Sequence, residues 1–318
     1  MKNLVSNFRK LLSLRLFAIV IVAISSLILM QCKKESEPLP PVISLVFDAG
    51  YTHDGDIVAI GKPIKFKVQA TGADANITNF TVKKVYGGVT KTVLDEGMNI
   101  EGFTRDLTFY QSIEEQVVWT LAVMDRNRNE ASVSITVNKD PNSQFGGIYE
   151  FPSIRMGYQS CTSYGHFFLP LMDKVFYTDS AAMYQNLVDI LVYFNYREDN
   201  GIMKPSPTFS SPGEETTPTT ELYTDYYPTL TSWTTRNYTK YDIRAVNGVT
   251  AVGFDNAHND SLLIVSYDDV WGKKKYKWAY AGTFIPIQTA AGKRGIIRVL
   301  EADTVETGTV RFALKLQM

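Results

Sequence analysis

The sequence contains few cysteines and histidines, the side chains that most often cross-link small domains or bind metals. It has two cysteines and three histidines in 318 residues. The histidines, His53, His166 and His258, are scattered and lack the spacing of metal ligands. Cys32 and Cys161 cannot supply a disulfide framework. We therefore expect a fold held by apolar packing, with no metal and no cofactor.

Neither sign of charge is in excess. The chain has 32 basic and 33 acidic residues and a formal net charge of −1. A nearly neutral chain lacks the basic surface that binds a nucleic-acid backbone, so we expect no nucleic-acid partner. The length suggests two domains, each large enough to bury its own core.

Known catalytic patterns are also missing. The sequence contains no metalloprotease helix, no nucleophile elbow and no dinucleotide-binding glycine pattern. Gly292-Lys293 lacks the other residues of a phosphate loop and is interpreted as a hairpin turn. Paired carboxylates for glycoside hydrolysis need not be close in sequence, and Asp189, Asp268 and Asp269 are candidates. We expect a non-catalytic protein, with a carbohydrate hydrolase as the alternative.

Long apolar segments are absent except for residues 16–30, which follow a basic stretch without acids. A basic start, a short apolar run and a processing site are the parts of a secretory signal. A helix of about 15 residues covers only ~22 Å, less than the ~30 Å hydrocarbon core of a bilayer. We predict a signal peptide over residues 1–31 rather than a lasting transmembrane span.

Leu29-Met30-Gln31-Cys32 resembles a bacterial lipobox. The resemblance implies that Cys32 is acylated and becomes the new N-terminus, joined to the protein by a tether over residues 32–41. Two or more acyl chains would give stable membrane anchoring. The alternative is that Cys32 is an unmodified thiol without a function, at the end of an apolar membrane anchor. Acylated Cys32 would leave Cys161 without a disulfide partner, and we expect Cys161 to be a small buried thiol.

Residues 33–37, Lys-Lys-Glu-Ser-Glu, are similar to the acidic export tags of Bacteroidota surface lipoproteins. That resemblance implies a protein that is lipid-anchored in the outer membrane and faces the cell exterior. A periplasm-facing protein is the alternative.

We predict that residues 42–139 form the first domain. Apolar residues alternate with polar ones at Ile64, Phe66 and Val68, and again over residues 117–123 and 131–137. A period of two with one apolar face indicates half-buried strands, and seven short strands with turns between them favour a β-sandwich. The hairpin over residues 117–137 resembles the end of PKD-type and related bacterial immunoglobulin-like domains. Trp119 is expected in the core.

The loop from Asp48 to Asp56 also contains His53 and Asp54. A calcium or sugar site is one interpretation. Because calcium loops space their oxygen ligands more regularly, turn chemistry is the favoured interpretation.

A polar linker leads into a second domain over residues 145–318. Residues 187–195 are almost all apolar and predict a central strand buried on both faces. Asp189 lies within this strand and is interpreted as a hydrogen-bonded structural residue rather than a catalytic acid. A short helix is expected over residues 180–185. We predict a larger β-rich domain, sandwich-like or jelly-roll-like, with one or two short helices.

The long loop over residues 205–228 contributes tyrosines, and a tryptophan follows it. Long loops often carry binding residues, and tyrosines suit both sugars and peptides. We predict that these aromatic side chains bind the ligand: Tyr223, Tyr226, Tyr227 and Trp233. Asp260-Ser261-Leu262 resembles the O-glycosylation motif of Bacteroidota, which implies a glycan on an exposed Ser261.

As a whole, the second domain resembles an uncharacterised domain found behind an immunoglobulin-like module in Bacteroidota surface lipoproteins. The resemblance rests on the Asp189 strand and on residues 233–239 and 292–299. The sequence therefore predicts a non-catalytic surface lipoprotein that contacts the membrane through Cys32 and binds a glycan or a protein. A structural component of an envelope assembly is a further alternative.

Overall fold

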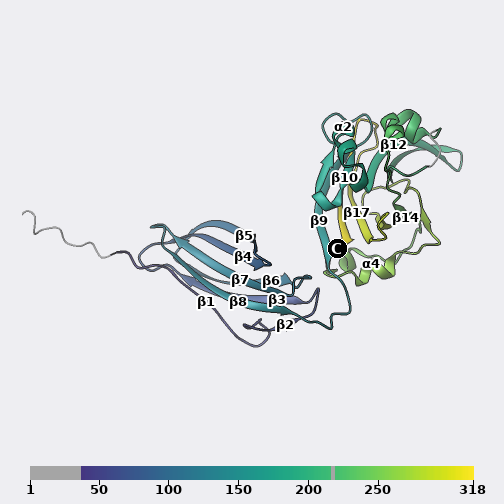
Figure 1. Ribbon diagram of the computed structural model, residues 1–318. Helices are drawn as coiled ribbons and strands as arrows, with labels where there is room; N and C mark the ends of the chain where they lie inside the picture. Colours follow the sequence, from purple (N-terminus) through teal and green to yellow (C-terminus); the bar gives the residue numbers. More distant parts are fainter. Residues whose placement is uncertain (1–36, 216–218) are drawn as a thin grey trace, which may run out of the picture.

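The computed structural model describes residues 37–215 and 219–318, which form two β-rich parts (Figure 1). The predicted leader and Cys32 lie outside the described residues. The first part, called here the N-terminal sandwich, consists of a three-stranded sheet in the order β1-β3-β6 and a five-stranded sheet in the order β2-β8-β7-β4-β5. Its strands are β1 Val42–Leu45, β2 Ile57–Val58, β3 Pro63–Thr71, β4 Ile77–Tyr86, β5 Val89–Ile100, β6 Gly102–Tyr110, β7 Gln116–Asp125 and β8 Glu130–Lys139.

The two sheets of the N-terminal sandwich enclose one apolar core. Ile64, Phe66 and Val68 of β3 face the inner residues of β7, including Trp119, which is stacked on Phe109. The hairpin between β7 and β8 closes where Asp125 accepts a hydrogen bond from the Asn129 backbone N–H at 2.8 Å. The predicted immunoglobulin-like β-sandwich is thus confirmed. The structure adds β2, which is too short to leave a periodic pattern, and β5, which lies at the edge of the five-stranded sheet.

The second part, called here the C-terminal unit, contains a six-stranded sheet in the order β15-β14-β16-β17-β18-β9 and a four-stranded sheet in the order β11-β10-β12-β13. The mainly β prediction is confirmed here too. The strands are β9 Ile148–Gly157, β10 Phe167–Leu169, β11 Lys174–Phe176, β12 Ile190–Asp199, β13 Ile202–Ser210, β14 Lys240–Asp242, β15 Gly272–Lys273, β16 Phe284–Gln288, β17 Arg294–Ala302 and β18 Thr309–Gln317.

The first half of strand β12, residues 190–194, is buried on both faces, as the unbroken apolar run predicts. Ile190, Val192 and Phe194 enter the core between the two sheets. Leu191 and Tyr193 face the opposite way, into a second core under the helical turns of residues 222–232. Residue 187 itself ends a 3-10 helix, so the strand begins three residues later than predicted.

Short helical segments cover the sheet faces. They are η1 Pro170–Met172, α2 Thr178–Ala181, η2 Ala182–Leu187, η3 Leu222–Tyr226, η4 Pro228–Ser232, α3 Ala251–Asp255 and α4 Ser261–Ser266. Within residues 37–215 and 219–318, no helix has the length and apolar character needed to span a membrane.

The two parts meet through direct contacts. The rings of Tyr110 and His258 are stacked with centroids 3.3 Å apart, and Asn259 Nδ2 donates to the Ile60 carbonyl at 3.3 Å. The buried Asp260 carboxylate accepts a hydrogen bond from the Gly146 backbone N–H at 2.8 Å. Ser261 follows it as the first, half-buried residue of α4. The motif Asp260-Ser261-Leu262 therefore starts at a buried residue beside this junction and enters α4, whereas an exposed Ser261 was expected.

One connection positions the site described below. Between β15 and β16 the chain crosses to β13, the edge of the other sheet. The backbones of Tyr276 and Phe209 exchange two hydrogen bonds there, at 2.9 and 3.0 Å. The crossing segment, residues 274–279, thus bridges the edges of both sheets.

Candidate functional site

The predicted aromatic ligand residues lie in the interior. Tyr223, Tyr227 and Trp233 are only 2%, 3% and 6% exposed and pack beneath the four-stranded sheet. The Tyr227 hydroxyl donates to the Val192 carbonyl at 2.7 Å, and the half-buried Tyr226 is stacked on Tyr193. The outer face of β12 is apolar and has to be covered, which is what these side chains do. The structure therefore assigns them to core packing, and the expectation of an aromatic ligand loop is corrected.

Asp189 lies immediately before β12 and is half-buried. Its Oδ1 accepts a hydrogen bond from Asn237 Nδ2 at 3.1 Å, and the Thr239 hydroxyl donates to its backbone carbonyl at 2.7 Å. Burial raises the pKa of this carboxyl from 3.8 to about 6, and the Asn237 hydrogen bond and the Lys293 charge oppose the rise only in part. Its contacts are those of a structural residue that ties β12 to the chain before β14.

The raised pKa predicts how stability depends on pH. A carboxyl that binds its proton more tightly in the folded state makes the protein lose stability as the pH rises from about 4 to about 6. Asp189→Asn keeps the acceptor for Asn237 and removes the ionisation, so we expect it to be more stable than wild type by about 1–3 kcal/mol near pH 7. The gain should vanish near pH 4, as measured by urea unfolding at both pH values.

The same substitution at the exposed Asp225 controls for the loss of one surface charge. An Asp189→Asn protein whose gain is equal at both pH values would contradict this account.

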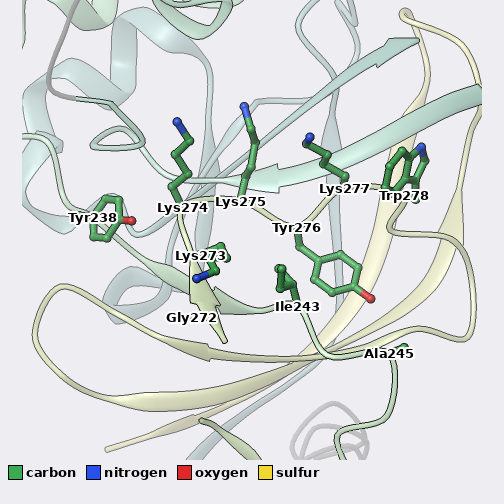
Figure 2. Close-up of a pocket in the computed structure, with 10 residues that line it drawn as sticks. All are labelled: Tyr238, Ile243, Ala245, Gly272, Lys273, Lys274, Lys275, Tyr276, Lys277 and Trp278. Atoms are coloured by element: carbon green, nitrogen blue, oxygen red, sulfur yellow. The ribbon is translucent and has the colours of Figure 1, made fainter. Parts of the chain in front are cut away.

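A pocket of about 660 Å³ opens where β14, β15 and the crossing segment meet. Its volume is that of small-molecule and saccharide sites. It is lined by Tyr238, Ile243, Ala245, Gly272, Lys273, Lys274, Lys275, Tyr276, Lys277 and Trp278 (Figure 2). Four of these ten residues are lysines and three are aromatic. We refer to it as the lysine pocket.

The lysine side chains have a defined arrangement. Figure 2 shows the amino groups of Lys274, Lys275 and Lys277 in a row on one side of the crossing segment, with the Tyr276 ring on the other side. Lys275 forms an ion pair with Glu214, a carboxylate that is only 3% exposed. Lys274 forms an ion pair with Glu215. Two of the lysines therefore already have a carboxylate partner.

Glu214 is the centre of a buried polar network behind this row of amines. Besides the Lys275 ammonium, its carboxylate accepts hydrogen bonds from the Ser210 hydroxyl at 2.6 Å and the Tyr193 hydroxyl at 3.3 Å. A buried carboxylate with three donors is well compensated and locks its partners in place. The network holds the Lys275 amine against the pocket wall.

The other two lysines form no ion pair with any carboxylate among the described residues. Lys273 Nζ donates only to the Val270 carbonyl, at 3.4 Å. Burial lowers the pKa of Lys277, and the neighbouring charges of Arg197 and Lys275 lower it further, against the weaker attraction of Glu214 and Glu221. Lys277 is thus a cation crowded by other cations. The lysine pocket keeps uncompensated positive charge.

Aromatic side chains complete the lining. Tyr238 is 40% exposed and precedes β14. Trp278 has φ +56, a conformation that bulky residues seldom adopt, and strain of this kind is enriched at functional sites. Its Nε1–H is buried and has no hydrogen-bond partner among the described residues. The pocket therefore offers aromatic surfaces and amines.

Other acidic clusters have structural roles. In the loop predicted to form by turn chemistry, Asp54 Oδ1 accepts from the Thr136 backbone N–H at 2.7 Å and Asp56 Oδ2 from the His53 backbone N–H at 2.8 Å. No cluster of three or more His, Cys, Asp or Glu side chains that could hold a metal occurs within residues 37–215 and 219–318. Cys161 is a buried free thiol, as expected.

No protein-family model matches the sequence, and no curated protein matches it. Three solved structures are similar over about a third of the chain. An engineered protein is 17% identical with a TM-score of 0.22, and the match covers 33% of this chain and 21% of that one. The CARDB domain of a Pyrococcus furiosus protein, in complex with di-metal ions, is 13% identical with a TM-score of 0.22, over 33% of this chain and 100% of that domain. Its solution NMR structure is 14% identical with a TM-score of 0.20, over 31% and 96%.

Proposed function

We propose that this chain is a non-catalytic surface lipoprotein of the Bacteroidota type whose C-terminal unit binds a glycan in the lysine pocket. Lipid on Cys32 anchors it in the outer membrane, facing the cell exterior. The N-terminal sandwich serves as a spacer between the tether and the binding unit. The lipobox resemblance supports the proposed membrane anchoring. The residues that line the pocket support the proposed glycan binding.

The observation that carries the glycan assignment is the combination of lining residues. Tyr238, Tyr276 and Trp278 provide aromatic surface, and sugar rings present apolar C–H faces that such surfaces cover. The lysine amines provide donors for the sugar's oxygen atoms. A pocket with both features suits a saccharide better than an apolar ligand.

Binding is favoured over hydrolysis because the acids considered for catalysis are occupied elsewhere. Asp269 lies within 4 Å of the cationic groups of Lys240 and Arg294, and Asp268 of Arg244. Asp189 is bonded to Asn237. Hydrolysis requires two facing carboxylates about 5–10 Å apart, whereas the ten lining residues of the pocket contain amines and rings.

Tyr238→Ala should weaken glycan binding while leaving the fold intact, because this ring is exposed at the pocket. We expect a loss of affinity of about tenfold or more, in line with about 1–3 kcal/mol for an aromatic platform. The full chain would be screened on a glycan array in a sugar-free polyoxyethylene detergent. Tyr164→Ala removes an equally exposed tyrosine outside the pocket and should bind as wild type. A blank array, or equal losses in both variants, would refute the assignment.

A further inference from the structure

Resting on that proposed function, we propose that the lysine pocket selects acidic glycans, whose carboxylate or sulfate groups pair with Lys277 and Lys273. This inference concerns the chemical class of the ligand, which a glycan-binding role alone leaves open.

The first argument is the local charge balance. Four lysines lie within five consecutive positions, at Lys273, Lys274, Lys275 and Lys277, and Arg197 lies close enough to influence Lys277. Glu214 and Glu215 neutralise two of the lysines. Arg197 is paired with Glu221. The positive charge that remains is on Lys273 and Lys277, in a chain whose overall charge is close to zero.

The second argument is the environment of Lys277. The charges of Lys275 and Arg197 lie near its ammonium, and the Lys277 side chain is exposed, so an anion can reach it. An anion placed beside it would offset the repulsion between these cations, because a nearby opposite charge favours the charged form of an amine. A neutral sugar hydroxyl would do this only weakly. The site is therefore better matched to a carboxylate or sulfate.

The third argument is the shape of the basic row. Lys273 and Lys277, which carry the remaining charge, are four residues apart, or about 13 Å along an extended segment. Figure 2 shows the Lys277 amine in line with those of Lys274 and Lys275, and the Lys273 amine apart from this row. Converging amines suit a single small anion, whereas two separated amines suit negative charges repeated along a polymer. Aromatic rings at Tyr238 and Trp278 lie at the two ends of this row in the view and can contact the sugar rings that carry those charges.

The proposal is tested with one saccharide backbone in two charge states. Oligogalacturonate and its methyl ester would be titrated calorimetrically into the full chain in polyoxyethylene detergent. Chondroitin sulfate and its desulfated form would supply a second pair, in which sulfate carries the difference. We expect the acidic form to bind about tenfold tighter at low salt in at least one pair. The preference should shrink as salt screens the charges.

Variants assign the preference to named residues. Lys277→Gln should lose most of the preference for the acidic form and keep its affinity for the neutral form, which shows that it is folded. Lys273→Gln should show a smaller loss of the same kind. Lys83→Gln removes an exposed lysine from the N-terminal sandwich and should match wild type.

The outcomes separate the two proposals. Equal affinity for the charged and neutral forms of both pairs overturns the acidic preference and leaves glycan binding in place. Failure to bind any of the four saccharides, together with a blank array, overturns both. Equally tight binding of an oligothymidylate of matched charge would assign the basic row to nucleic acid and overturn the glycan class.

Discussion

Glu214→Ala is expected to lower the free energy of unfolding of the C-terminal unit by about 3–5 kcal/mol. Removing one partner of a buried ion pair leaves an uncompensated charge, and that loss is typically of this size. Here the Lys275 ammonium would lose its carboxylate, and the Ser210 and Tyr193 hydroxyls would lose their acceptor. Glu214→Gln keeps an acceptor for the hydroxyls and should cost about 1–3 kcal/mol.

Glu215→Ala is the matched control for this experiment. Glu215 is the next residue and pairs with Lys274, but that pair is more exposed, with side chains 23% and 40% accessible. Exposed ion pairs contribute about 0–1 kcal/mol, so the control should lose no more than that. Urea unfolding monitored by tryptophan fluorescence measures both. A Glu214→Ala protein no less stable than Glu215→Ala would show that the buried network is not a structural centre.

Cys32→Ser is expected to move the protein almost completely from the membrane to the soluble fraction. The thiol is the acceptor of the first acyl chains in the lipobox interpretation, and each buried methylene contributes about 0.8 kcal/mol to membrane binding. Loss of all the acyl chains removes this whole contribution to membrane binding. Metabolic labelling with a fatty-acid analogue should detect label on wild type and none on the variant.

Cys161→Ser serves as the control, because Cys161 is buried in the C-terminal unit. It should keep both the acyl label and the membrane fraction. Retention of Cys32→Ser in the membrane would mean that residues 16–30 act as a plain apolar anchor.

The strands were predictable where the pattern of apolar residues indicated both the strand and its buried face. Ile64, Phe66 and Val68 alternate with lysines and a glutamine, and that alternation alone places them in the core of the N-terminal sandwich. The unbroken apolar run of β12 likewise predicts burial on both faces. In these segments the local sequence pattern and the tertiary environment impose the same requirement.

The tyrosines of the loop before β14 could not be placed by such a pattern. Tyr223 and Tyr227 stand in a polar, Thr-rich stretch that is typical of an exposed loop. They are buried because the outer face of the four-stranded sheet needs apolar cover, and the hydroxyls find partners such as the Val192 and Pro212 carbonyls. That requirement comes from a sheet assembled from segments far apart in the sequence. The residues next to each tyrosine therefore do not predict its burial.

The lysine pocket was missed for a related reason. The run Lys273-Lys274-Lys275-Tyr276-Lys277-Trp278 is visible in the sequence as basic residues interleaved with aromatics. By itself it is equally typical of a solvated surface. Its meaning depends on the pairing of Tyr276 with Phe209 and on Glu214 behind Lys275, contacts between residues more than sixty positions apart. The basic-aromatic interleaving was the signal that could have drawn attention to it.

The most direct test of the central claim, that the lysine pocket is the glycan site, is lysine footprinting. The full chain would be treated with an acetylating reagent with and without oligogalacturonate or chondroitin sulfate, and modification at each lysine would be measured by mass spectrometry. The account predicts protection of Lys273, Lys274 and Lys277 by a bound saccharide and unchanged modification of Lys83. Protection confined to lysines outside the pocket, with Lys277 modified at the same rate throughout, would contradict it.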